Sequence, residues 1–276
     1  MLEAISEEKN IVKKWVKKYK IDGIISDNRL GVFSKKIPSV FITHQLNVMT
    51  GNTTWFTSKI HRHIIKKYTA CWIPDVNSES NLTGKLGHLE NNSLTLEYLG
   101  PLSRMHKMAL PKQYDLMIIL SGPEPQRGML EKHLVGEVKR FEGKVVFIKG
   151  IIEAEQKKEQ IGNVTYYNFM KTRQLEQTFN ESDKVLCRSG YTTIMDLVKL
   201  NKKAFFIPTP GQYEQVYLAK KLQDEGLVPF NSQEAFRIED ISKIEQFKGL
   251  PQLDTTVNWE KLFTVFIKRK KSEYRM

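Results

Sequence analysis

Short apolar runs that alternate with helical segments constrain the fold of this chain more than any other feature. Nine runs of three to five residues have the length and the aliphatic or aromatic content of buried strands, and most lead into residues with helical spacing. They lie near residues 23–26, 39–43, 70–73, 116–120, 145–148, 164–167, 185–187, 204–207 and 228–230. Strands that alternate with helices build parallel sheets, so the sequence predicts an α/β protein.

The distribution of these runs predicts two domains. Three runs precede a stretch that contains glycine and prolines, and six follow it. We therefore expect a partial first domain over residues 1–100, a linker over 101–111 and a complete second domain over 112–255. A C-terminal helix and a basic tail should occupy 256–276. A chain of 276 residues with 40% hydrophobic content has enough apolar material for one or two cores.

Cysteine content and charge exclude several classes of protein. Cys71 and Cys187 are far apart and lack the spacing of metal ligands, so we expect reduced thiols and no metal site. The first residues are not those of a signal peptide, and no run approaches the ~18 apolar residues of a membrane span, which favours a cytoplasmic protein. The 43 Lys and Arg exceed the 31 Asp and Glu, which favours an acidic partner. No nucleic-acid recognition motif accompanies that charge, so we do not expect nucleic acid.

Basic residues cluster in three places, residues 13–20, 59–67 and 268–271. In the first cluster an apolar stripe with helical spacing lies opposite the lysines, and it consists of Val12, Trp15, Val16 and Tyr19. This pattern is typical of ordinary surface helices and also of helices that lie on a membrane. A peripheral contact with the inner face of the membrane is therefore one of two interpretations.

The segment 183–197 is the clearest candidate binding site. An apolar strand ends before Ser189 and Gly190, and helical spacing resumes from Thr192, so a helix should begin just beyond the carboxyl end of a strand. The unpaired N–H groups and positive dipole of such a helix start suit a phosphate. Asp196 follows Ser189 by seven residues, which places it on the same helix face ~10 Å further along and suits a ribose diol. Ser189 is equally explained as a structural N-cap.

The next strand leads to a second polar opening. Two prolines and a glycine end the run at 204–207, and the following helix opens with Gln212, Glu214 and Gln215. In a doubly wound sheet, neighbouring strands deliver such openings to one crevice, so these groups should share a ligand with Ser189. Solvated residues of a first helical turn are the alternative.

In these segments the chain resembles the donor half of MurG-type glycosyltransferases of family 28. The matching residues are Cys187-Arg-Ser-Gly-x-x-Thr-x-x-Asp196, Ile207-Pro and Glu214-Gln-x-x-x-Ala219. The similarity begins at Tyr167-Asn-Phe-Met170 and ends near Gly226. Such enzymes have the GT-B fold, so the resemblance implies two Rossmann-like domains with parallel sheets, of which the first is incomplete.

The resemblance also implies roles for single residues. Asp196 would accept the ribose hydroxyls, Ser189 and Gly190 would contact the diphosphate, and Phe169 and Met170 would cradle uracil. Glu214 and Gln215 fall where the family has two glutamines that hold the donor sugar, so Glu214 departs from the pattern and leaves the sugar open. The full set of expected donor-binding residues is Ser121, Gly122, Arg127, Phe169, Met170, Arg188, Ser189, Gly190, Thr192, Asp196, Gln212, Glu214 and Gln215.

The phosphate loop after the first strand of the second domain departs from the family pattern. Residues 121–127 read Ser-Gly-Pro-Glu-Pro-Gln-Arg and keep a single glycine. The two prolines remove backbone donors, so we expect Ser121, Gly122 and Arg127 to hold the anion in place of a full amide loop.

The first domain offers candidates for proton transfer. Residues 37–47 resemble the middle of the family's acceptor domain, whereas its glycine-rich, histidine-bearing loop has no counterpart here. An inverting transfer needs a base for the acceptor hydroxyl, and we expect His44 or Asp27, each at a strand end, to supply it. A hydrogen-bonded structural histidine and a turn aspartate are the alternatives. Weaker candidates are His61, His63, His88, His106 and His133.

The sequence therefore predicts a metal-independent GT-B glycosyltransferase without a cofactor. It would move the sugar of a UDP-hexose or UDP-N-acetylhexosamine to a hydroxyl acceptor such as a lipid or a cell-envelope glycan. A nucleotide-sugar hydrolase or epimerase on the same fold, and a non-catalytic nucleotide-sugar-binding fragment, are the alternatives. A longer form of the chain or a partner subunit would supply the missing strands.

Overall fold

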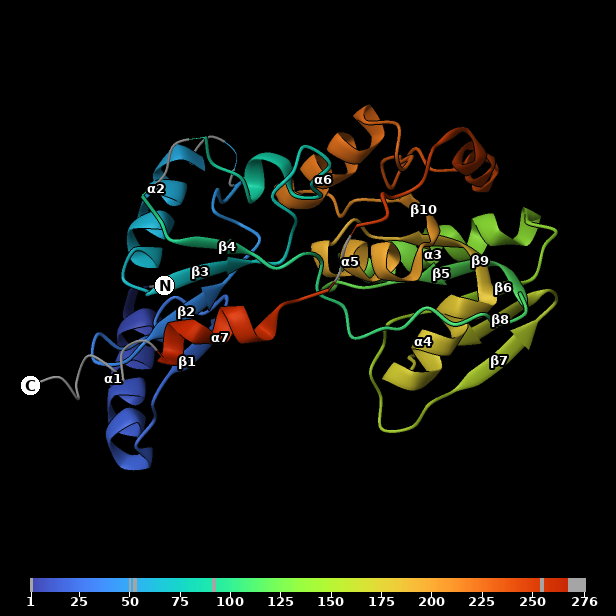
Figure 1. Cartoon of the computed structure of the whole chain (residues 1–276). Helices are drawn as coiled ribbons and strands as arrows, with labels where there is room; N and C mark the ends of the chain where they lie inside the picture. Colours follow the sequence, from blue (N-terminus) through green and yellow to red (C-terminus); the bar gives the residue numbers. More distant parts are fainter. Residues whose placement is uncertain (1, 50, 52–53, 91–92, 254–255, 268–276) are drawn as a thin grey trace, which may run out of the picture. The chain divides into compact units, whose positions relative to one another are not determined.

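The computed structural model describes residues 2–49, 51, 54–90, 93–253 and 256–267 (Figure 1). The chain forms two compact units. Unit 1 combines the residues up to Leu102 with the C-terminal segment, and unit 2 spans Ser103–Leu253. The stretch expected as a linker packs on unit 2, where the Met108 N–H donates to Asn180 Oδ1 at 2.8 Å.

Unit 1 contains a four-stranded parallel sheet in the order β1-β2-β3-β4. Its strands are β1 (Ile24–Asp27), β2 (Ser39–Ile42), β3 (Ala70–Ile73) and β4 (Leu96–Tyr98). The first three were expected from the sequence. The fourth was not, because it is only 3 residues long and its side chains are half-buried, so no apolar run marks it.

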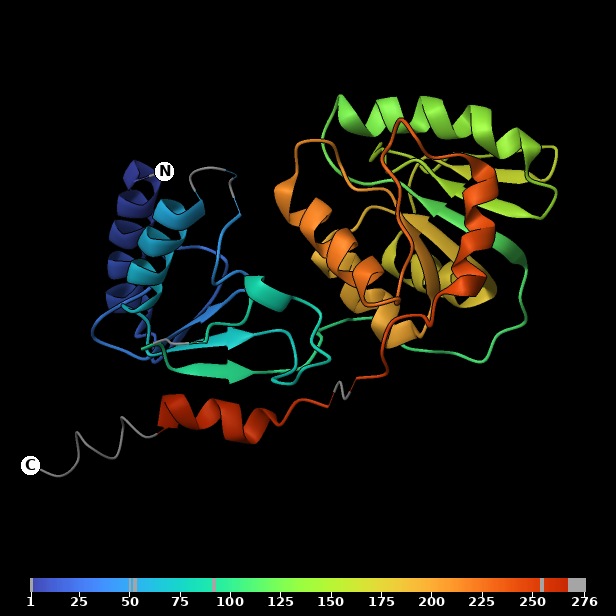
Figure 2. The same ribbon diagram turned by 90° about the horizontal axis from the view of Figure 1, so that it is seen from above.

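Helices cover both faces of this sheet, as Figure 2 shows. One face packs α1 (Leu2–Tyr19) and α2 (Thr54–Ile65), with Ile64 and Ile65 against Phe41. The other face packs α7 (Trp259–Ile267), with Leu262 in a cluster with Val40 and Trp72. Because both faces are covered, successive side chains of β2 and β3 are buried, which explains their unbroken apolar runs.

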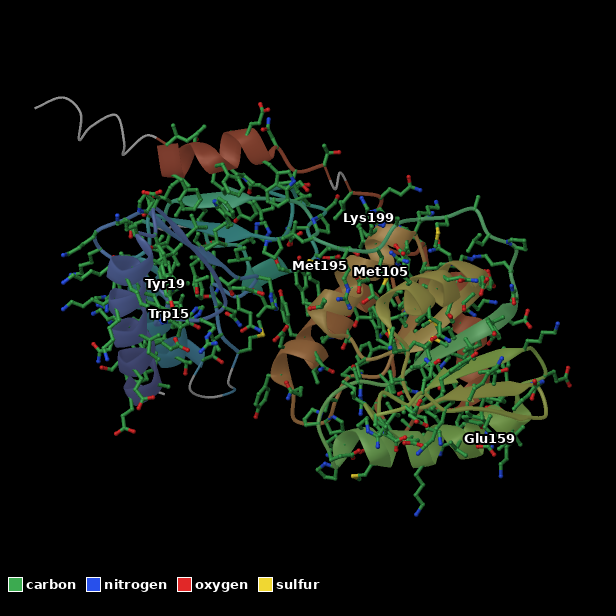
Figure 3. The ribbon with its side chains drawn as sticks, turned by 90° about the horizontal axis from the view of Figure 1, so that it is seen from below. Trp15, Tyr19, Met105, Glu159, Met195 and Lys199 are labelled. Atoms are coloured by element: carbon green, nitrogen blue, oxygen red, sulfur yellow. The ribbon has the colours of Figure 1, made fainter. Side chains whose placement is uncertain are left out.

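The basic clusters differ in how far the structure describes them. On α1, Val12 is buried, whereas Trp15 and Tyr19 are 54% and 59% exposed (Figure 3). The cluster at 268–271 lies outside the described residues. No described helix combines the length and the apolar content that crossing a bilayer would require.

Unit 2 contains a six-stranded sheet in the order β10-β9-β5-β6-β8-β7. Its strands are β5 (Tyr114–Ile119), β6 (Val145–Ile148), β7 (Lys158–Ile161), β8 (Val164–Tyr167), β9 (Ser182–Cys187) and β10 (Lys203–Phe206). The polar, fully exposed β7 pairs antiparallel with β8 and was not expected. The strand expected at 228–230 was wrong, since only a single bridge joins Phe230 to Phe206.

The helices of unit 2 are α3 (Gln126–Glu137), α4 (Thr172–Glu181), α5 (Tyr191–Leu200) and α6 (Tyr213–Asp224), with 3-10 turns η3 (Val138–Arg140) and η4 (Ile238–Gln246). A core of buried residues lies between the sheet and α3, η3 and η4. After β5 the chain crosses over to β6, toward the β7 end of the sheet, whereas after β9 it crosses over to β10 at the opposite end. Right-handed crossovers therefore put α3 and α5 on opposite faces, and the sheet has a switch point between β5 and β9.

Candidate functional site

Three loops meet at the carboxyl edge of the sheet in unit 2. They follow the adjacent strands β5, β9 and β10 and lead into α3, α5 and α6. This edge includes the switch point, where ligands bind in open α/β sheets. Eleven of the thirteen donor-binding residues that the sequence predicted lie in these loops or on the helices that follow them.

The loop after β9 has the predicted strand–break–helix geometry. Gly190 is the N-cap of α5 with φ −72° and ψ 139°, and no side chain caps the helix there. A Cβ on Gly190 would meet nothing within 4 Å. Neither the backbone angles nor the packing requires glycine at this position, whereas close approach of a ligand to the helix start would. Thr192, in the same first turn, is exposed.

Ser189 and Gln215 join this loop to the loop after β10. The fully buried Ser189 donates its hydroxyl to the Gln215 main-chain oxygen at 2.8 Å. The Gln215 side-chain oxygen in turn accepts from the Thr209 N–H at 2.9 Å. The hydroxyl of Ser189 and the Oε1 of Gln215 therefore fix the shape of the edge, which leaves the main chain of Ser189 as its contribution to a ligand.

Arg188 is a buried cation at the centre of this edge, 1% exposed. Its guanidinium donates to the main-chain oxygens of Ile207, Pro208 and Gln126 at 3.0–3.1 Å and to Gln233 Oε1 at 2.8 Å. These partners are neutral, and Nε has none among the described residues. Burial lowers the pKa of Arg188 to about 10, which leaves it charged at neutral pH. Its donors face the protein, so Arg188 braces the loops and adds positive charge behind them.

The loop after β5 provides fewer ligand contacts than expected. Ser121 and Gly122 are exposed, and Gly122 has φ +98°, a conformation that favours glycine. Arg127, by contrast, binds Glu124, Glu131 Oε2 at 2.6 Å and the Lys149 main-chain oxygen. Although burial opposes its charge, the hydrogen bonds to the two glutamates hold the pKa of Arg127 above its usual value. The structure thus commits Arg127 to protein carboxylates, and we leave it out of the proposed site.

Asp196 lies on α5 and is oriented by the segment at the start of unit 2. Its Oδ1 accepts a hydrogen bond from the Ser103 hydroxyl at 2.6 Å, and the Met105 N–H donates to that hydroxyl at 3.0 Å. Figure 3 labels Met105, whose N–H binds Ser103, and Met195, which precedes Asp196 in the sequence. Burial raises the pKa of Asp196, and the Ser103 hydrogen bond partly offsets the effect. Ser103 is 93 residues away in sequence, so no local pattern pointed to it.

The expected base-binding residues follow β8 at the same sheet edge. Phe169 and Met170 are half-buried, and the Met170 sulfur accepts from the Thr178 hydroxyl at 3.4 Å. Buried Asn168 holds this loop, since its Oδ1 accepts from the N–H groups of Lys157 at 2.8 Å and Phe169 at 2.9 Å. Asn168 was not a candidate, although a polar residue directly after an apolar strand is a signal for one.

The loop after β10 opens α6 with the expected polar residues. Gln212 is the exposed N-cap, and Glu214 lies half-buried in the first turn. Together with the Gly190 tip, they give this edge amide, carboxylate and main-chain donors and acceptors from neighbouring strands. Such a set can bind an anion and a polyhydroxylated group side by side.

In unit 1, the two expected proton-transfer residues lie at the carboxyl edge of its sheet. Asp27 is the exposed last residue of β1 and pairs in register with Ile42. His44 follows β2 by two residues and is half-buried, with Nε2 3.4 Å from the Gln45 amide nitrogen. Adjacent strands therefore place both groups at one edge.

A third titratable group at this edge was not a candidate. Asp75 follows β3 by two residues and is completely buried. It accepts from the Thr83 hydroxyl at 2.5 Å and lies 3.4 Å from His88 Nε2. A titratable residue at the end of an apolar strand or within two residues of it is the signal that would have found Asp75, the same signal that marked Asp27 and His44.

The comparisons with known proteins agree with this architecture. Residues 127–246 match the family model described as glycosyltransferase family 28 C-terminal domain. The chain is 24% identical to a UDP-N-acetylglucosamine–N-acetylmuramyl-(pentapeptide) pyrophosphoryl-undecaprenol N-acetylglucosamine transferase of Haemophilus ducreyi, over 89% of this chain and 68% of that protein. A protein of the same name from a Sulfurihydrogenibium species is 27% identical over 48% of this chain and 36% of its own length.

Solved structures show the same fold at low identity. MurG of Acinetobacter baumannii has a TM-score of 0.54 and 14% identity, over 98% of this chain and 76% of that one. The glycotransferase of kitacinnamycin has a TM-score of 0.59 and 12% identity, over 87% and 71%. The predicted GT-B fold is thereby confirmed, and so is the resemblance to MurG-type glycosyltransferases.

Proposed function

We propose that this chain, whose second unit carries the C-terminal domain of glycosyltransferase family 28, binds a UDP-sugar at the carboxyl edge of β5, β9 and β10. In this proposal the sugar passes to a hydroxyl acceptor. The observation that carries it is the open helix start at Gly190, with Asp196 further along the same helix and a buried positive charge at Arg188.

The diphosphate fits the start of α5. The first-turn N–H groups point out of the helix and carry its positive partial charge. Gly190 adds no side chain that would block a close approach, and the main chain of Ser189 lies beside it. The charge of Arg188 behind the loops increases the attraction for an anion, since its hydrogen-bond partners are neutral.

The nucleoside and the sugar fit the flanking residues. Asp196, already oriented by Ser103, accepts the ribose hydroxyls, and Phe169 and Met170 contact uracil. Gln212, Glu214 and the amide NH2 group of Gln215 bind the sugar at the start of α6, since Gln215 Oε1 already accepts from Thr209. The names of the curated relatives specify an N-acetylglucosamine donor, which supports a UDP-N-acetylhexosamine or UDP-hexose here.

The transfer is a displacement at the anomeric carbon of the sugar. The acceptor oxygen forms a bond to that carbon, the bond to the diphosphate oxygen breaks, and a base takes the hydroxyl proton. The α5 N–H groups stabilise the charge that develops on the leaving diphosphate, so we propose that no metal is needed. His44 and Asp27 are the bases that the sequence suggests.

The relatives' names and the residues of unit 1 support the proposed acceptor and location. The relatives' names specify a pyrophosphoryl-undecaprenol acceptor, which supports a lipid-linked or cell-envelope acceptor for this chain. The exposed Trp15 and Tyr19 among the lysines of α1 support a cytoplasmic protein that contacts the inner membrane face. β1 is the outer strand of its sheet, and Ile25 on it is 44% exposed. Further strands, from a longer form of the chain or from a partner subunit, would pair there.

Calorimetry with UDP tests the donor site. Asp196→Ala should weaken binding by about 1–3 kcal/mol, or about 5- to 150-fold in Kd, because a charged hydrogen bond is lost. Asp183→Ala is the matched control, since Asp183 lies exposed at the opposite end of β9. Absence of heat with UDP and with UDP-sugars, on folded protein, would refute the proposal.

A UDP-release assay separates the alternatives. Release from donor alone, without acceptor, would indicate a nucleotide-sugar hydrolase, and conversion of the sugar without release would indicate an epimerase. Binding without either reaction would leave a non-catalytic nucleotide-sugar-binding module.

A further inference from the structure

Asp75 is a buried carboxylate at the edge of unit 1 that the proposed function does not use. It accepts from the N–H groups of Val76, Leu82 and Thr83 at 2.8–3.0 Å and from the Thr83 hydroxyl. Burial alone would raise the pKa of this carboxyl, but the hydrogen bonds from His88, Thr83 and Leu82 outweigh it and lower the pKa. Asp75 is therefore ionised at neutral pH.

The ionised carboxylate determines which ring nitrogen of His88 donates a hydrogen bond to it. An ionised Asp can only accept hydrogen bonds, so the His88 Nε2 atom, 3.4 Å from Asp75 Oδ2, carries the proton. The contact is long, as hydrogen bonds in sites without ligand often are. In the neutral ring the other nitrogen, Nδ1, then keeps its lone pair. This is the arrangement in which a carboxylate prepares an imidazole to accept a proton.

His88 is also accessible and held in place. Its side chain is 22% exposed, whereas Asp75 is fully buried. The ring stacks on Tyr98 with centroids 4.9 Å apart and 21° between the planes. Asp75 and Tyr98 are the titratable groups that contact it, and burial together with the Asp75 charge raises the pKa of Tyr98. Tyr98 therefore stays neutral, and Asp75 is the charged neighbour.

His88 lies beside the loop that carries His44. The N–H groups of Leu46 and Asn47 donate to the Leu86 main-chain oxygen at 2.7 and 3.0 Å. A Cβ on Gly87 would lie 3.1 Å from the His44 main-chain oxygen. The loops after β2 and β3 thus pack together, which puts Asp75 and His88 at the edge where the candidate bases lie.

The other histidine with a described carboxylate partner outside this cluster is His106. Its Nδ1 lies 3.0 Å from Glu176 Oε1 in unit 2, but its side chain is 79% exposed. An exposed pair is screened by water and weakly oriented. His88 is distinguished by a partner that is fully removed from solvent and held by several hydrogen bonds.

We propose that His88 is the general base of the transfer and that Asp75 is its positioning residue; this rests on the proposed function. His88 Nδ1 takes the proton of the acceptor hydroxyl as the oxygen bonds to the anomeric carbon and the diphosphate leaves with the electron pair. Asp75 keeps the proton on Nε2 and stabilises the imidazolium that forms. His44 and Asp27 then have no proton-transfer role.

Turnover and donor binding separate this proposal from the proposed function. His88→Gln should lower UDP release from UDP-N-acetylglucosamine about 100-fold or more, measured with bacterial membrane lipid as the acceptor source. Its Kd for UDP should stay within about 2-fold, because the donor site lies in unit 2. His106→Gln, which removes the exposed histidine paired with Glu176 in unit 2, is the matched variant and should retain turnover within about 3-fold.

The position of the ring proton tests Asp75. Asp75→Asn removes the carboxylate that accepts from His88 Nε2, so the proton should no longer stay on Nε2 in ¹⁵N-histidine NMR, and turnover should fall while the Kd for UDP is kept. A merely structural role would lower turnover without moving the proton. Should this variant fail to fold, ¹⁵N-histidine NMR of the unmodified chain still reports whether His88 carries its proton on Nε2.

The outcomes are distinct. No UDP binding would refute the proposed function, and this inference with it. Intact UDP binding without UDP release from any donor would refute the proposed transfer and this inference together. Intact UDP binding with unchanged turnover in His88→Gln, or with the proton found on Nδ1, would refute the inference alone.

Discussion

Each unit buries one charge just beyond a central parallel strand, and the two charges have opposite signs. In unit 2, Arg188 directly follows β9 and donates to four oxygen atoms of neutral groups. In unit 1, Asp75 follows β3 and accepts from N–H groups, a hydroxyl and a histidine. A buried charge is costly unless hydrogen bonds replace its water, and both sites meet that condition.

The two sheet edges differ in the chemistry that their residues suit, which is anion binding in unit 2 and proton transfer in unit 1. The edge of unit 2 combines a helix start, glycines and a cation without a bonded carboxylate, which suits holding an anion. The edge of unit 1 combines Asp27, His44, Asp75 and His88, which suits moving a proton. The four predictions below begin with the two buried charges and end with a substitution that should leave stability unchanged.

Arg188→Met should cause the largest loss of stability. It leaves four oxygen atoms at the centre of unit 2 without their donor, and we expect the free energy of unfolding to fall by about 3–5 kcal/mol. Urea denaturation followed by circular dichroism measures this. Lys220→Met, which breaks the exposed pair with Asp224, is the control and should cost less than about 0.5 kcal/mol. Equal small effects would show that the buried cation does not brace the loops.

Asp75→Asn should cost about 2–4 kcal/mol at pH 7, because an amide group cannot accept at both oxygens of the original carboxylate. The pKa of Asp75 is lowered in the folded state. Its contribution is therefore complete above the unfolded value of about 3.9 and is lost as pH falls through the lower, folded value. Urea midpoints of both proteins at a series of pH values should converge below pH 4. A difference that persists there would mean that the charge is not responsible.

Lys202 is a buried charge with fewer hydrogen-bond partners than Arg188 or Asp75. Its effect on the pH dependence of stability can therefore be compared with theirs. It is 6% exposed and shares the main-chain oxygens of Asn180 and Ser182 with Lys112. Burial, with help from Lys112, lowers the pKa of Lys202 to about 7. The unfolded chain then binds more protons between about pH 7 and 10.5, so stability should rise with pH by up to about 1.4 kcal/mol per unit.

Lys202→Met should abolish that rise and should not lower stability at pH 7, because Lys112 still donates to both oxygens. Thermal melts of both proteins from pH 7 to pH 10 check this. Lys203→Met, which removes the half-exposed neighbour paired with Glu245, is the control and should keep the slope. Parallel curves for Lys202→Met and the unmodified chain would contradict the prediction.

Gly190→Ala should have the smallest effect on stability, within about 1 kcal/mol, since φ is −72° and the added methyl group meets nothing. UDP affinity should nevertheless fall, because the methyl group occupies the approach to the helix start. Gly150→Ala is the contrasting variant, with φ +72° and the Leu120 oxygen 2.3 Å from the new Cβ, and it should destabilise the fold. Unchanged UDP affinity in Gly190→Ala would show that the ligand does not approach this turn.

Sequence patterns predicted the elements whose burial is uniform. Strands such as β3 and β6 have four buried side chains each, and an unbroken apolar run marks them. The exposed β7 and the short β4 lack that mark, because their pairing comes from a neighbouring strand and not from their own apolar content. The run at 228–230 shows the reverse, since an apolar run formed a single bridge and not a strand.

The candidate site was predicted where its geometry is local. The strand end, the glycine and the helix start around Gly190 lie within a few residues, so their spacing alone placed them. Two of the bonds that decide what a side chain does are long-range, since the Ser189 hydroxyl is held by residue 215 and Asp196 is held by Ser103. Arg127 is held by Glu124 and Glu131, three and four residues away, and also by the main-chain oxygen of Lys149.

The amino-acid sequence by itself determined the α/β alternation and the order of the binding loops, because strand burial and helix spacing are set by residues close along the chain. Tertiary structure alone decided which polar groups remain available to a ligand. Hydrogen bonds join residues brought together by the sheet order, and a donor already satisfied inside the protein, such as the Ser189 hydroxyl, is withdrawn from binding whatever its position in a motif suggests.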